Sequence, residues 1–170
     1  TLLALGELEE ARDAFHRTVM VSRVNSGPKS LEQTNYLYSV AEIELRLGDA
    51  EATTRVLETI YTIHNSHYGE FNPDLLPAMQ QLHDWYVEKK PLFAGQFRAA
   101  DFQNLALLGA RVAQLTEARY GLGTPEAAAQ YRALGQIHFR AIIYMIQTGE
   151  FPNIDHVIDP GRSDGQTTRQ

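Results

Sequence analysis

The chain has 170 residues, with 15 Lys and Arg against 21 Asp and Glu and a net charge of -6. This length allows one domain or a short stack of repeats with a hydrophobic core, and the acidic balance argues against a nucleic-acid ligand, because like charges repel. The absence of Cys excludes disulfides, thiolate metal sites and a Cys nucleophile.

Apolar residues recur at helical spacing along most of the chain. In one clear example, Tyr36, Val40, Ile43 and Leu47 step by four, three and four residues and so share one face of a helix. The alternation of apolar and polar residues that is typical of strands is absent. We therefore predict an all-α fold of about six helices. In chain order, the predicted helices span residues 7–24, 31–47, 50–66, 74–89, 97–119 and 126–147.

Short turn sequences separate the predicted helices. Gly48 can adopt the left-handed conformation that ends a helix, and Asp49 can cap the next one, which predicts a tight hairpin. Asn72 and Thr124 each precede a Pro, the arrangement favoured at helix N-termini. The Pro and Gly residues in 150–170 predict a C-terminal tail.

Two sequence echoes indicate internal repeats. Residues 5–11 resemble residues 47–53, a displacement of 48 − 6 = 42 positions, and residues 67–74 resemble residues 119–126, a displacement of 121 − 69 = 52 positions. The surplus of 52 − 42 = 10 residues falls in an insertion around 89–101. We divide the predicted repeat domain, residues 1–149, into units near 1–29, 30–72 and 73–124 and a partial unit at 125–149.

The repeats resemble the tetratricopeptide repeat family, whose units are two antiparallel helices with small and large apolar residues at set positions. Tyr131, Leu134 and Gly135 match its aromatic, Leu and small residue in the first helix, and Ala11 with Phe15 match positions of the second helix. The Tyr-Gly-x-x-x-Pro connector and the longer spacing resemble the repeats of kinesin light chains. The resemblance implies an α-solenoid, a right-handed superhelix of antiparallel helix hairpins.

The resemblance is degenerate in places. Glu44 replaces the usual aromatic residue, His83 replaces the small residue, and Lys90 stands where Gly would end the hairpin. These departures weaken the third unit most, and the 89–101 insertion lies in the same unit.

The family resemblance implies a protein-interaction module that binds a peptide segment or a partner helix in a concave groove, without catalysis and without a cofactor. Groove-facing positions lie on the first helix of each unit, between its packing positions. Carried over one by one, they are Asn35, Tyr38, Glu42, Arg46, Gln80, Asp84, Glu88, Arg132, Gln136 and Arg140. Asn and Arg side chains there could hold a peptide backbone or a terminal carboxylate. The alternative is that these side chains are simply solvated surface.

The last predicted helix is apolar on nearly all sides between 137 and 146, which implies burial on more than one face. The side chains of a possible oligomer surface are Phe139, Ile142, Ile143 and Ile146. The expected covers are, in order, residues 151–158 folding back, a second copy in a homodimer, and a different protein. A structural or self-associating fragment of a longer array is therefore our second functional hypothesis. It also fits a chain that begins at Thr1, without Met, near the end of a helix.

A metal- or ligand-binding domain is a minor third hypothesis. His64 and His67 lie three residues apart at a helix end, but the sequence places no third ligand, so we predict no metal site. His83 and His138 are expected to be hydrogen-bonded core residues. No catalytic motif is recognisable, and we predict that the chain is not an enzyme.

The sequence also indicates whether the protein inserts into a membrane or carries a secretion signal. No apolar stretch reaches the ~20 residues that a bilayer span requires, and the N-terminus lacks the features of a signal peptide. We therefore expect a soluble protein whose compartment and partner stay undetermined.

Overall fold

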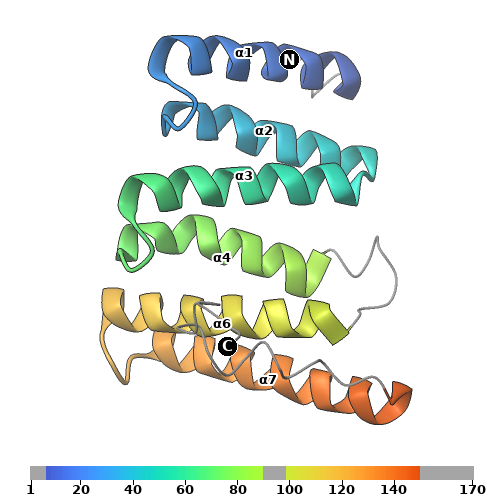
Figure 1. Cartoon of the computed structure of the whole chain (residues 1–170), viewed down its shortest axis with the longest axis vertical. Coiled ribbons are helices and arrows are strands. Elements are labelled where there is room, and N and C mark those ends of the chain that lie inside the picture. The colour runs from blue at the N-terminus through green and yellow to red at the C-terminus, as the bar shows by residue number, and fades with distance from the viewer. Residues whose placement is uncertain (1–6, 90–98, 150–170) are drawn as a thin grey trace, which may run out of the picture.

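A computed structural model describes residues 7–89 and 99–149 of the chain (Figure 1). Within these ranges the chain forms α-helices and no strand. The six helices are α1 (Leu8–Ser26), α2 (Glu32–Leu47), α3 (Ala50–Tyr68), α4 (Leu76–Asp84), α6 (Ala99–Tyr120) and α7 (Pro125–Thr148). They stack one after another in chain order, with α1 at one end and α7 at the other (Figure 1). The prediction of an all-α fold with six helices is confirmed.

The fourth predicted helix, 74–89, consists of three pieces. A 3₁₀ turn over Pro73–Leu75 leads into α4, and a π-helix over Trp85–Lys89 continues it. The 89–101 insertion and the tail at 150–170 lie largely or wholly outside the described residues, as do residues 1–6.

Local signals explain where the helices begin and end. Gly48 has φ of 80°, the left-handed conformation predicted from the sequence. The Asp49 carboxylate accepts a 2.7 Å hydrogen bond from the Ala52 backbone N–H, and the Thr124 hydroxyl accepts one from Ala127. These bonds satisfy N–H groups that have no partner inside the helix. The predicted hairpin turn and the predicted helix start at Thr124 are confirmed.

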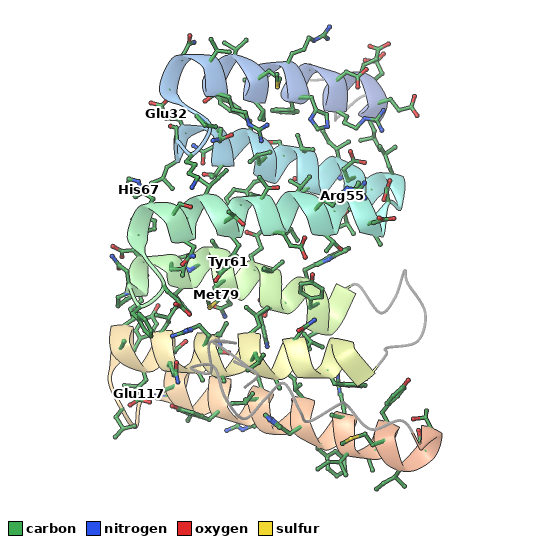
Figure 2. The ribbon with its side chains drawn as sticks, in the orientation of Figure 1. Glu32, Arg55, Tyr61, His67, Met79 and Glu117 are labelled. Atoms are coloured by element: carbon green, nitrogen blue, oxygen red, sulfur yellow. The ribbon has the colours of Figure 1, made fainter. Side chains whose placement is uncertain are left out.

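The hydrophobic core forms a seam along the stack. Its larger cluster joins α1, α2, α3, α4 and Trp85 of the π-helix, and a smaller cluster around Leu75, Met79 and Val112 joins α4 to α6. Tyr61 packs against both clusters. Figure 2 shows Tyr61 between α3 and α4, and Met79 between α4 and α6. Each helix therefore depends mainly on its neighbours in the chain for burial.

Two sequence predictions are wrong for α7, the helix at the end of the described stack. His138 was expected in the core but is exposed on α7, where its Nδ1 lies 2.9 Å from the Leu134 carbonyl oxygen. Tyr131, expected at a packing position, is also exposed, and its hydroxyl donates a hydrogen bond to Glu117. The reason is that α7 packs on α6 along one side, whereas the prediction assumed neighbours on two sides.

Candidate functional site

A groove of about 640 Å³ lies between α2 and α4, and α3 contributes its floor. Residues of α2 form one wall and residues of α4 form the other, and α3 lies between these two helices. The residues that line the groove are Tyr38, Ser39, Ala41, Glu42, Leu45, Thr53, Leu57, Pro77, Gln80, Gln81, Asp84 and Trp85.

Four of the ten groove residues expected from the sequence line this groove, and they are Tyr38, Glu42, Gln80 and Asp84. Two further candidates on α2, Asn35 and Arg46, are exposed outside the lining. Arg132, Gln136 and Arg140 are exposed on α7, also outside it. The side chain of Glu88 lies outside the described residues. The groove thus brings together predicted residues of α2 and α4, whereas the predicted residues of α7 lie outside it.

The floor of the groove was not predicted from the sequence. Leu57 and Trp85 are buried residues of the larger core cluster, yet they also line the groove. Ser39 and Gln81 were not predicted either, although each directly follows a predicted residue, Tyr38 and Gln80 respectively. Helical spacing could have suggested Gln81, since it lies three residues before the predicted Asp84 and so shares its helix face.

The walls of the groove are polar and its floor is mainly apolar. Gln80 and Gln81 each offer an amide that can donate and accept, which suits the N–H and C=O groups of a peptide backbone. Burial raises the pKa of the Tyr38 phenol, so this side chain remains a neutral hydrogen-bond donor. The arrangement can therefore combine apolar contact at the bottom with hydrogen bonds at the sides.

Both carboxylates of the groove have a positively charged or ionisable neighbour on their own helix. Arg46 donates a 2.6 Å hydrogen bond to Glu42, one turn away, and each of these side chains is about half exposed. The Asp84 carboxylate lies 3.3 Å from Nδ1 of the buried His83 and is also about half exposed. An exposed pair such as Arg46–Glu42 contributes only about 0.2–1 kcal/mol. Both carboxylates also remain about half exposed to solvent.

Trp85 fixes the floor where α4 passes into the π-helix. Its side chain is 2% exposed, and its indole N–H donates a 2.9 Å hydrogen bond to the Thr54 hydroxyl of α3. Next to it, the Tyr86 hydroxyl donates to the Glu58 carboxylate of α3. These two bonds tie the end of α4 to α3 and so set the shape of the groove at that end.

A smaller groove of about 340 Å³ lies between α1 and α3, on the other side of α2. Its lining includes Val19 and Arg23 from α1, Glu44 from α2, and Arg55 from α3. Arg55 pairs with Glu51 at 3.0 Å, one turn away, as Arg46 pairs with Glu42 on α2. This groove was not predicted from the sequence.

The apolar residues expected to form an oligomer surface are exposed on α7. Phe139 is 64% exposed and Ile146 is 73% exposed, with Ile142 and Ile143 between them at 49% and 38%. The expected cover by residues 151–158 lies outside the described residues.

The two histidines considered for metal binding lie close together on α3, but the described residues hold no group of three or more His, Asp or Glu side chains arranged for a metal ion. The His64 ring lies 5.8 Å from that of Tyr68, centroid to centroid, and the His67 ring lies 4.9 Å from it. Both ring nitrogens of His64 are buried without a hydrogen-bond partner in the described part of the chain. Burial, and then the nearby His67, lower the pKa of His64.

His64 should make the protein less stable in mild acid. The unfolded chain has the ordinary His pKa of about 6.5, so it takes up a proton before the folded state does as the pH falls. The free energy of unfolding should therefore decrease as the pH drops below about 6.5, and the decrease is complete below the folded-state pKa. Urea denaturation of wild type and His64→Gln between about pH 5 and about pH 8 measures this, and the variant should show the flatter profile. The same substitution at the exposed His16 is the control, and equal profiles for wild type and His64→Gln would contradict the assignment.

A scan against protein-family models finds no match to the chain, and a search of curated proteins finds no match either. Among the described residues, no helix is both long enough and apolar enough to cross a membrane.

Proposed function

We propose that the chain is a tetratricopeptide-like interaction module, with its helix hairpins arranged as a right-handed superhelix, and that it binds an extended segment of another protein in the groove between α2 and α4. The observation that carries this proposal is the groove itself, with polar walls and a mainly apolar floor. In the proposed architecture α2 and α4 are the first helices of successive units, the elements that line the concave face.

The size and chemistry of the groove suit a few residues of an extended peptide. Its volume, about 640 Å³, lies in the range of pockets that hold a small ligand or several side chains. Leu57 and Trp85 offer apolar contact, and the amides of Gln80 and Gln81 can pair with a peptide backbone. Because Trp85 is buried in the larger core cluster and bonds to Thr54 of α3, the floor of the groove needs little ordering before a peptide binds.

Peptide selection tests the proposal. Peptides are selected from a random display library on the whole protein, and binding of the synthetic peptides is followed by the fluorescence of Trp85, the only Trp in the chain. Gln81→Phe places a neutral ring at an exposed position of the groove wall and should weaken binding by about tenfold or more, because it excludes the peptide.

Gln136→Phe is the matched control, because it makes the same change at an exposed position of α7 outside the groove. Circular dichroism checks that both variants keep their helices. Weakening by Gln136→Phe but not by Gln81→Phe would move the site to α7, and unchanged binding in both variants would reject the groove.

Self-association is a second candidate, favoured by the exposed Phe139, Ile142, Ile143 and Ile146 on α7. The chain would then act as a structural piece of a larger assembly, with this surface buried between copies. Sedimentation equilibrium tests this candidate, since the mass of a monomer, 19.1 kDa, at micromolar concentration would contradict it.

A further inference from the structure

The charges that face the α2–α4 groove are unbalanced. Glu42 on α2 and Asp84 on α4 each present a carboxylate to it, from opposite walls. The lining contributed by α3 is uncharged, and the described lining residues include no Lys or Arg. The groove is therefore negative, within a chain whose overall charge is also negative at -6.

The existing partners of these carboxylates can be exchanged. Arg46 contacts Glu42 from outside the lining, and both side chains are about half in solvent, so little is lost when the carboxylate turns to another cation. Asp84 lies beside His83, which is buried behind it and does not line the groove. A cation that enters the groove thus meets two carboxylates that are already partly desolvated and accessible.

The rest of the lining suits the other parts of a basic side chain. Tyr38 is a half-buried aromatic residue one turn before Glu42, and an aromatic face attracts ammonium and guanidinium groups. Ala41 and Leu45 supply apolar surface for the methylene groups of a Lys or Arg side chain. Carboxylate, aromatic face and apolar surface therefore occur together along one wall.

We propose that the occupant of the groove is an extended peptide segment that carries Lys or Arg, with its cationic group between Glu42 and Asp84. This inference rests on the proposed function and adds the chemical class of the partner. Charge complementarity decides for a basic segment over an acidic or purely apolar one. An acidic segment would face two like charges, and an apolar one would desolvate both carboxylates further without offering them a cation.

The test uses the peptides selected from the random display library. They should be enriched in Lys and Arg, and their affinity should fall as salt is added. Glu42→Gln combined with Asp84→Asn keeps the shape of both side chains and removes both charges, so affinity should fall by about tenfold or more. Replacing the key Lys of the peptide by Gln should weaken binding to wild type, and should cause little further loss with the double variant.

Glu51→Gln combined with Asp13→Asn is the matched control. It changes the net charge equally, from -6 to -6 + 2 = -4. Glu51 has an equivalent Arg partner one turn away, and neither residue lines the groove. This variant should bind within about twofold of wild type, since it leaves only weak long-range effects.

The outcomes separate this inference from the proposed function. Peptides that lose affinity with Gln81→Phe but not with Glu42→Gln plus Asp84→Asn would retain the groove and overturn the basic partner. Selected peptides without Lys or Arg would overturn it as well. Peptides that are indifferent to Gln81→Phe and leave Trp85 emission unchanged would reject the groove itself. Thermal unfolding of both double variants confirms that each is folded.

Discussion

Trp85→Ala should lower the free energy of unfolding by about 3–5 kcal/mol, because it removes a large buried side chain and leaves a cavity. The indole is 2% exposed, belongs to the larger core cluster and bonds to Thr54 on α3. Its loss removes packing and also the contact that fastens the end of α4. Urea denaturation followed by circular dichroism measures the effect.

Trp85→Phe is the matched control for this substitution. It keeps an aromatic ring and loses the indole N–H, while the Thr54 hydroxyl still donates to the Ala50 carbonyl oxygen. The expected loss is smaller, about 1–2 kcal/mol, since most of the packing remains. Equal losses for Ala and Phe would show that the hydrogen bond, and not the packing, determines the stability at this position.

Gly109→Leu should destabilise the protein by about 1–3 kcal/mol through overpacking. Gly109 lies on α6, and an added Cβ would meet Leu134 Cδ1 at 3.2 Å, His83 Nε2 at 3.3 Å and Ile137 Cδ1 at 3.4 Å. The absence of a side chain thus lets α4 and α7 both approach α6 at this point. A Leu side chain would have to push these helices apart, and urea denaturation measures the cost.

Gly109→Ala separates crowding from helix propensity. A methyl group meets only the ends of side chains that can move by a few tenths of an ångström, and Ala favours the helix by about 1 kcal/mol over Gly. The two effects oppose each other, so the Ala variant should lie within about 1 kcal/mol of wild type. A Leu variant as stable as the Ala variant would contradict the close approach of the three helices.

The helices were predictable because their signals are local. Gly48 and Asp49 mark a turn by their own conformational preferences, and Thr124 marks a helix start through a cap that reaches only three residues. The π-helix at Trp85–Lys89 had no such local signal, and the contacts of its Trp85 and Tyr86 side chains are with α3, about 30 residues away in the chain.

The site was predictable only in part, because it depends on distances between helices. Helical register, applied to the positions that the family resemblance implied, puts Tyr38 and Glu42 on one helix and Gln80 and Asp84 on another, and these four side chains line the groove. The same register could not show that the candidates on α7 lie outside the groove. Helical register also could not distinguish residues of the groove floor from residues of the core, since Trp85 is both buried and part of the groove lining. The prediction that His138 lies in the core was wrong for a related reason, because periodicity does not reveal which side of a helix has a neighbour.

The position of the groove within the stack affects how it recognises a partner. Helices at the ends of a stack have one neighbour, and their hydrogen bonds open most readily in local fluctuations. The walls and floor of the groove belong to α2, α3 and α4, each of which has a neighbour on both sides (Figure 1). A peptide that binds there meets a surface whose side chains are already restrained, so the entropy lost on association falls mainly on the peptide. Discrimination between peptides should therefore depend on how well each one fits a fixed surface. Among the described helices, α1 and α7 have one helix neighbour each and are the ones more free to adapt.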